Sequence, residues 1–113
     1  MSTNKGCEHS GQTFIQGTIY DKAGNRINGV KIAMSGGGPD GEVAATRESG
    51  QDGDGFFSII VNAYGASPGQ KRWVWVVENG RRVSDVVVFE FNNLGPDVPG
   101  VCWRGFVDFV LQY

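Results

Sequence analysis

The chain has very little of the residues from which metal and redox centres are built. Its 113 residues include one histidine and two cysteines, and neither cysteine belongs to a Cys-x-x-Cys pair. A structural zinc site takes four ligands, mostly cysteine and histidine, so this small supply argues against one.

Long apolar runs and a surplus of positive charge are also missing. No segment approaches the roughly 20 apolar residues of a membrane-spanning helix, so we expect no membrane insertion. Ten lysines and arginines are scattered among twelve acidic residues, which gives a formal net charge of −2. Nucleic-acid-binding proteins carry a basic footprint, and this chain lacks one. We therefore expect no nucleic acid among its partners.

The first residues, MSTNKGCEHSGQ, are polar and lack the apolar centre of a secretory signal. We expect residues 1–12 to form a flexible N-terminal segment and residues 13–113 to form a single domain. A chain of this size can bury about two-thirds of its unfolded surface in one core. Two locations stay open: intracellular if residue 1 is the native start, or extracellular if the sequence is part of a longer precursor.

What the sequence does contain is glycine, with 18 residues, and alternating apolar side chains. A period of two residues indicates strands rather than helices. Turn residues fill the connections, and Asn79-Gly80 is typical of a type I′ hairpin. The pattern predicts an all-β fold, a seven-stranded antiparallel β-sandwich. The expected strands are 14–21, 27–35, 42–48, 56–62, 71–78, 81–92 and 101–112.

The alternation also predicts which side chains fill the core. A one-residue error in register would exchange the inward and outward sets of a strand, so the neighbours in each strand are the alternative. The expected inward residues are Ile15, Ile19, Val30, Ile32, Phe57, Ile59, Val74, Val76, Val86, Val88, Phe106 and Val110.

The first hairpin and the segment near residue 56 carry the spacing of a known family. QGTIYDKAGNRINGVKI matches the pattern G-x-V-x-D-x-x-G-x-P-I-x-G-V-x-V, with Arg26 in place of the proline, and Asp54, Gly55, Phe57 and Ile59 match T-x-x-D-G-x-F-x-I. Over about residues 13–90 the chain resembles the carboxypeptidase regulatory-like, or transthyretin-like, β-sandwich family. The resemblance implies an Ig-like, transthyretin-like sandwich in a secreted or cell-surface protein. The matching hairpin residues are Gly17, Ile19, Asp21, Gly24, Ile27, Gly29, Val30 and Ile32.

Within that hairpin the matching residues have local structural roles. We expect Asp21 to accept hydrogen bonds from turn amides. Gly24 suits a positive φ, and we expect Gly29 to let the backbone approach closely beside Val30. These residues shape the turn and need carry no chemistry.

One branch of the resembled family hydrolyses 5-hydroxyisourate, and this chain lacks the histidine of that enzyme. Thr18 occupies the histidine position, and the one histidine, His9, lies in the polar N-terminal segment. Without a base the hydrolysis has no proton acceptor. No Gly-x-Ser-x-Gly motif offers a nucleophile. We therefore expect the protein not to be an enzyme.

Trp73 and Trp75 are two residues apart on one strand, so both face the side opposite Val74 and Val76. If the valines point inward, the tryptophans form an outward strip, and exposed apolar area of this kind needs a function. Stacking on carbohydrate is one interpretation, and burial in the core or in an interface with another domain are the others. Further members of the strip would be Tyr20 and Trp103.

The stretch GQDGDGFF raises the possibility of calcium. When Gly55 is aligned with the invariant glycine of an EF-hand loop, Asp52 and Asp54 take ligand positions, but the first and last ligands are missing. A looser site formed by Asp52 and Asp54 with Asp21 is the alternative to turn-forming aspartates. We otherwise expect no cofactor.

Cys7 and Cys102 permit one disulfide, which spacing alone cannot prove. A bridge would close nearly the whole chain into a loop, for which chain entropy suggests about 4 to 5 kcal/mol of stability. It would also tie down the N-terminal segment. Two unpaired thiols are the alternative.

These features predict a non-catalytic β-sandwich module with a structural or adhesive binding role. Its expected partners are other domains or proteins, with polysaccharide as the carbohydrate candidate. The alternative is a self-associating subunit of an extracellular assembly, a homo-oligomer in which the edge of the long strand 81–92 pairs between copies.

Overall fold

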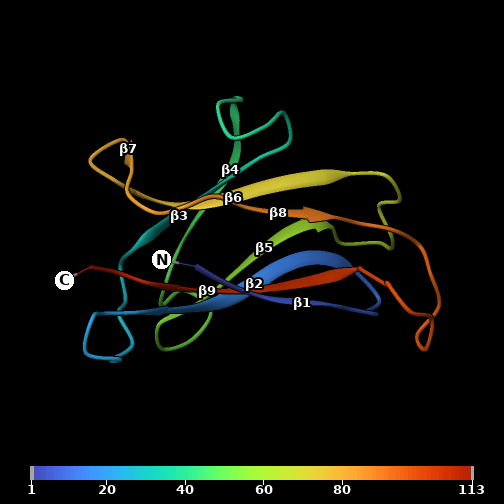
Figure 1. The fold of residues 1–113 in the computed structure, drawn as a ribbon, viewed down its shortest axis with the longest axis horizontal. Helices are drawn as coiled ribbons and strands as arrows, with labels where there is room; N and C mark the ends of the chain where they lie inside the picture. Colours follow the sequence, from blue (N-terminus) through green and yellow to red (C-terminus); the bar gives the residue numbers. More distant parts are fainter. Residues whose placement is uncertain (1, 113) are drawn as a thin grey trace.

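The computed structural model describes residues 2–112, which form nine strands and no helix. Residues 2–112 therefore contain no helix that is long and apolar enough to cross a membrane. Sheet A has the order β1-β9-β2-β5. Sheet B has the order β4-β3-β6-β7, and β8 also pairs with β6. The two sheets lie face to face as two layers (Figure 1). The strands are β1 Ser2–Glu8, β2 Thr13–Tyr20, β3 Lys31–Ser35, β4 Val43–Glu48, β5 Phe56–Asn62, β6 Lys71–Glu78, β7 Arg81–Arg82, β8 Val87–Glu90 and β9 Arg104–Val110.

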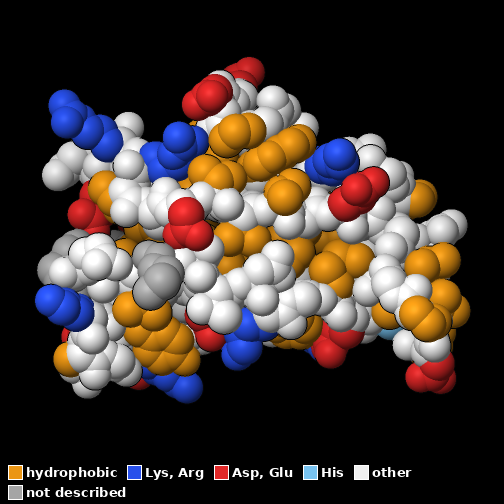
Figure 2. Space-filling view, in the orientation of Figure 1, with side chains coloured by type: hydrophobic (Ala, Val, Ile, Leu, Met, Phe, Trp, Pro, Cys, Tyr) orange, Lys and Arg blue, Asp and Glu red, His pale blue; other side chains and the backbone are white. Residues whose placement is uncertain are grey.

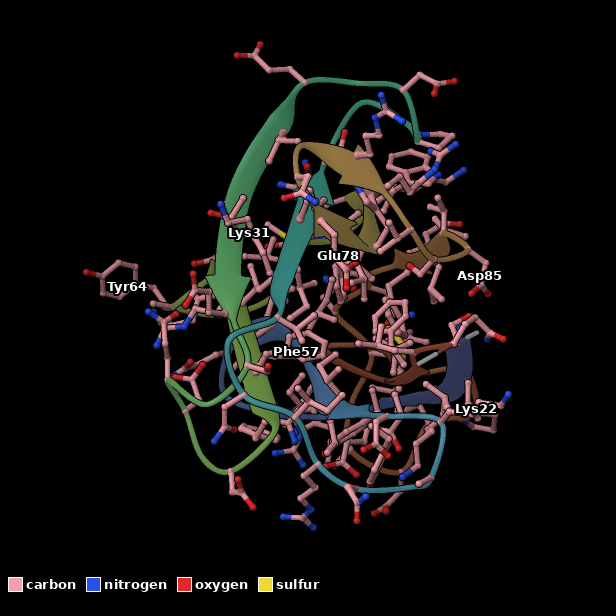
Figure 3. The ribbon with its side chains drawn as sticks, turned by 90° about the vertical axis from the view of Figure 1, so that its left-hand side faces the viewer. Lys22, Lys31, Phe57, Tyr64, Glu78 and Asp85 are labelled. Carbon is pink, nitrogen blue, oxygen red and sulfur yellow. A yellow bond between two sulfur atoms is a disulfide. The ribbon has the colours of Figure 1, made fainter. Side chains whose placement is uncertain are left out.

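The core lies between the layers, where Phe57 projects from β5 toward sheet B (Figure 3). The inward prediction is confirmed in four of the expected strands, 14–21, 27–35, 56–62 and 71–78. The confirmed residues, all at most 8% exposed, are Ile15, Ile19, Val30, Ile32, Phe57, Ile59, Val74 and Val76.

In β8 and β9 the predicted inward set is wrong. Val88 is 48% exposed, and Val86, Phe106 and Val110 are only half-buried. Their neighbours fill the core instead. Apolar residues occur in both alternating sets of these strands, and the prediction took the wrong set. The charged residues Glu90, Arg104 and Asp108 all belong to the outward set and were the signal for the correct direction. The buried neighbours are Val87, Phe89, Val107 and Phe109.

The N-terminal segment is a second correction. The sequence predicts flexibility over residues 1–12, whereas Ser2–Glu8 form β1 and pair antiparallel with β9. The amide of Trp103 also donates to the Glu8 carbonyl at 3.0 Å. The side chains of β1 are mostly exposed, so the strand has no apolar alternation that a sequence pattern could detect. Its order comes from backbone pairing and from the disulfide described below.

The predicted wholly antiparallel arrangement is also wrong at one place, because β2 and β9 pair in parallel. A tight hairpin would force neighbouring strands to be antiparallel. The strand before β9 is β8, which belongs to the other sheet. The connection between β8 and β9 therefore crosses between layers and leaves the direction of β9 free.

All four sheet edges are irregular. The register shifts between Asn4 and Gly6 where β1 pairs with β9, between Thr13 and Phe14 in the β2–β5 pair, and between Met34 and Ser35 in the β3–β4 pair. On the fourth edge, the predicted strand 81–92 is split into β7 and β8 by residues 83–86. Bulged edges pair poorly with other strands, and proteins use them to limit edge association.

The first hairpin follows its predicted geometry except at Gly29. Asp21 Oδ1 accepts the amides of Ala23 at 2.9 Å and Asn25 at 2.8 Å, and Gly24 has φ +88°. Gly29 has φ +81° and open space around it, so its conformation, not a close approach, requires glycine. The close approach occurs at Gly17, where an added Cβ would lie 1.5 Å from the Val107 carbonyl oxygen.

Candidate functional site

The two neighbouring tryptophans point outward from sheet B. Val74 and Val76 of β6 are fully buried in the core, so the alternation turns Trp73 and Trp75 to the opposite face. Trp75 is nevertheless only 6% exposed, whereas Trp73 is half-buried. The two side chains therefore differ in what a ligand could reach.

Trp75 belongs to a covered part of this outer face. Ala33, directly opposite Trp75 on β3, is only 1% exposed. The segment 36–42, between β3 and β4, rises on the side of sheet B that faces away from sheet A (Figure 1). It is tied down because Arg82 Nη1 donates to the Pro39 carbonyl at 3.1 Å. Trp75 is thus a packing residue.

Trp73 lies in a row of side chains that crosses the outer face of sheet B, and Ser35 in that row is fully buried. Ser35 is opposite Trp73 and also opposite Val43, and Val88 is opposite Trp73 on the other side. Val43 is 44% and Val88 is 48% exposed. Figure 2 shows hydrophobic side chains gathered over sheet B, with acidic and basic groups beside them. We call Val43, Trp73 and Val88 the tryptophan patch.

Tyr20 and Trp103 do not join that patch. Tyr20 ends β2 and points outward from sheet A, because Ile19 before it is fully buried. Trp103 precedes β9; its Nε1 donates to the Leu94 carbonyl at 3.0 Å, and its ring lies 4.5 Å from that of His9. The structure therefore brings together one of the four predicted strip residues with new neighbours, and not the strip itself.

The outer face of sheet A carries an aromatic group that the sequence analysis missed. Phe14, Tyr20, Phe56 and Phe106 alternate with buried residues on β2, β5 and β9, and all four are half-buried. The guanidinium of Arg104 lies 5.5 Å from the centre of the Phe14 ring and 4.9 Å from that of Phe106. We call these four residues the aromatic face. The detectable signal was the presence of phenylalanine in both alternating sets of β9, Phe106 in one and Phe109 in the other.

Two ion pairs stand beside the aromatic face, both between β1 and β9. Arg104 pairs with Glu8, and Lys5 Nζ lies 3.3 Å from Asp108 Oδ2. Asp108 Oδ1 also accepts the amide of Thr18 at 3.0 Å. A cationic and an anionic side chain thus flank Phe106 two residues away on either side.

Cys7 and Cys102 form a disulfide with their Cα atoms 4.7 Å apart. Neither cysteine of the chain is free. The bond joins the exposed edge strand β1 to the segment that leads into β9. There the amide of Cys102 donates to Asn92 Oδ1 at 2.9 Å. The disulfide therefore anchors both the N-terminal strand and the connection between the two sheets.

The aspartates considered for calcium are engaged in turns. Asp52 accepts from Arg47 Nε at 2.9 Å and from the Ser58 amide at 3.0 Å, and its bond to Arg47 holds the pKa of this carboxyl below its usual value. Asp54 accepts from Asn28 at 3.2 Å. The Asn25 amide similarly lowers the pKa of Asp21. Within residues 2–112, no three His, Cys, Asp or Glu side chains form a group that could hold a metal.

A hollow of about 530 Å³ lies at the end of sheet B that faces the viewer in Figure 3, where Lys31 and Glu78 are labelled. Glu48 and the backbone of the Asn79-Gly80 turn complete one side of it. Asn79 and Gly80 have φ of 51° and 75°, as the hairpin prediction requires. The residues that line this hollow include no serine, cysteine or histidine, so it offers no nucleophile or imidazole base.

No protein-family model matches the chain, and no curated protein matches it. The two outer faces and the disulfide are therefore the features of the chain that bear on its function.

Proposed function

We propose that the chain is a non-catalytic module with a structural or adhesive binding role in a secreted or cell-surface protein. The proposed fold assignment is an Ig-like, transthyretin-like sandwich related to carboxypeptidase regulatory-like domains. The turn chemistry of Asp21 and Gly24 and the two-layer arrangement support it. Nine strands in place of seven and the parallel β2–β9 pair are departures from the expected pattern.

The disulfide supports the location outside the cell. Disulfides form and persist in oxidising compartments and are rare where glutathione keeps thiols reduced. Cys7 lies on an exposed edge strand, where a cytosolic reductant could reach it. In a reducing compartment this disulfide would be reduced, and the first strand would lose its covalent attachment.

Carbohydrate is the ligand class that we propose for this module, and the tryptophan patch is its binding site. The observation that carries this proposal is the half-buried Trp73 directly beside exposed Val88, with exposed Val43 farther along the same row beyond the buried Ser35. The apolar face of a sugar ring can cover an indole. Lys71 and Glu90, opposite each other at the next outward position, can then bond to sugar hydroxyls.

Tryptophan fluorescence during titration with a panel of soluble polysaccharides tests the proposal. A saturable change in the wild-type signal is expected, and Trp73→Ala should abolish it. Trp103→Ala is the matched control, because Trp103 lies at the end of sheet A and should leave binding unchanged. If no polysaccharide binds, or if Trp73→Ala binds as the wild type does, the carbohydrate proposal is wrong.

Self-association through the edge of strand 81–92 has less support. Ser84 Oγ accepts the Val76 amide at 2.8 Å, so a side chain takes a place that a strand backbone would otherwise fill. The register of this edge then resumes at Val87 opposite Val74. An assembly that uses this edge would have to pair with an interrupted strand.

A further inference from the structure

We propose that the outer face of sheet A is a weak homodimer interface in which β9 of one copy lies antiparallel across β9 of a second copy. This inference rests on the structural and adhesive role proposed above and uses the opposite face from the tryptophan patch. It differs from edge pairing because no backbone hydrogen bonds are shared between copies.

The composition of the face is that of an interface core. Phe and Tyr are enriched at the centres of protein interfaces, as is Arg, whereas most solvent-facing sheet surfaces are polar. Arg104, with a side chain 30% exposed, stands between Phe14 and Phe106. Ile60, opposite Phe14 on β5, is 57% exposed. Ile60 therefore extends the apolar surface from the aromatic face to β5, the edge strand of sheet A.

The residues lie in rows across the four strands. One row contains Glu8, Arg104, Phe14 and Ile60, each opposite the next. The central row contains Phe106 and Gln16. A third row contains Asp108, Thr18 and Phe56, joined by the Thr18–Asp108 hydrogen bond and the Thr18–Phe56 pair.

A second copy fits this arrangement through a two-fold axis that crosses the strands at the central row. Sheets that pack face to face keep their strands nearly aligned, about 10 Å apart. Such an axis exchanges the first and third rows and sets Phe106 against its own equivalent. Arg104 then faces Asp108 of the second copy, and Ile60 faces Phe56 of the second copy. The charges are thus self-complementary, as an isologous interface requires.

The size of the face sets the expected strength. Four strands about 4.8 Å apart, with about seven residues of 3.3 Å each, cover roughly 450 Å² per copy. Stable interfaces bury about 800 Å² per partner, so the dimer should be weak and reversible. The sheet edges are irregular and pair poorly with other strands. Association through this face does not require any edge strand to pair.

Sedimentation equilibrium with two opposite charge reversals tests the interface. The wild-type mass should rise with concentration from 12.2 kDa toward twice that value. Arg104→Asp alone and Asp108→Arg alone should stay monomeric, because like charges then face each other. An equimolar mixture of the two variants should associate again, since each reversed charge meets its complement. The Glu90→Arg variant on sheet B is the matched control and should dimerise as the wild type does.

Ile60→Asp guards against failure of the charge variants to fold, because Ile60 lies outside the core. It should remain folded and monomeric at every concentration. A wild type that stays monomeric overturns the proposal. So does a mixture that associates no better than its components, or an Ile60→Asp variant that still dimerises. Polysaccharide binding by Trp73 is measured separately, so failure of one proposal does not imply failure of the other.

Discussion

The outer faces of the two sheets both carry aromatic side chains, but they are built differently. On sheet B, Trp75 is only 6% exposed, whereas Trp73 is half-buried and lies beside the exposed Val88. On sheet A, four aromatic side chains are all half-buried and are interleaved with Arg104 and Asp108. The first face presents one indole in an apolar row, whereas the second presents a mixed surface with charges of both signs. An outward-facing aromatic residue is therefore not evidence of a binding site until its cover is known.

The largest expected effect comes from Gly17, where the backbones of β2 and β9 lie close together in sheet A. Gly17→Ala should prevent folding, because the new Cβ would lie 1.5 Å from the Val107 carbonyl oxygen. We expect a loss above about 4 kcal/mol in the free energy of unfolding, measured by chemical denaturation. Gly11→Ala is the control, since nothing lies within 4 Å of its added Cβ. A folded Gly17→Ala protein would show that β2 and β9 are farther apart.

Removing the disulfide tests the attachment of β1 to sheet A. Cys7→Ser with Cys102→Ser should lower the free energy of unfolding by about 3 to 5 kcal/mol, because the bond closes most of the chain. Hydrogen exchange should show that the β1 amides lose protection first, while the amides of sheet B stay protected. Equal protection of β1 in both proteins would mean that backbone pairing alone holds the strand.

The two tryptophans of β6 provide a direct comparison within sheet B. Trp75→Ala should cost about 3 to 5 kcal/mol, as expected for a buried aromatic side chain. Trp73→Ala should cost about 1 kcal/mol or less, because its side chain is only half-buried. Thermal or urea unfolding of the two variants measures the difference. Similar costs would contradict the assignment of Trp75 to packing and Trp73 to the surface.

The smallest effect concerns Asp52, in the turn between β4 and β5. Its folded pKa is below its ordinary value of 3.8 because Arg47 donates to the carboxylate, so its stabilisation is present above the unfolded pKa. That contribution is lost as pH falls through the folded pKa. Asp52→Asn should therefore cost about 1 kcal/mol or less at neutral pH. Wild type and variant should converge in stability below that pKa, as unfolding measured between pH 7 and 2 would show. A constant difference would contradict this.

Much of the fold follows from local pattern, and the misses have physical causes. Turn chemistry at Asp21, Gly24 and Asn79 predicted the hairpins, since φ preferences depend on the residue itself. The strand β1 has polar, exposed residues held by backbone bonds, and no alternation marks such a strand. In β9 apolar residues occur in both sets, and only Arg104 and Asp108 mark the outward set, so the direction is missed when apolar residues alone are considered.

The candidate site was only partly accessible to sequence reasoning. The outward direction of Trp73 and Trp75 follows from their spacing, given inward valines, and the structure places them so. The burial of Trp75 depends on packing between distant parts of the chain, which a local pattern does not predict. The aromatic face joins β2, β5 and β9, so its residues meet only once the sheet order is known.

If the two outer faces serve different partners, polysaccharide binding should respond to a change on sheet B and not to one on sheet A. Ile60→Asp and Trp73→Ala are titrated with the same polysaccharide panel and followed by calorimetry, which needs no tryptophan signal. The account predicts that Ile60→Asp binds with the wild-type affinity, whereas Trp73→Ala does not bind. Binding that survives in Trp73→Ala and disappears in Ile60→Asp would place the carbohydrate on sheet A and contradict the account.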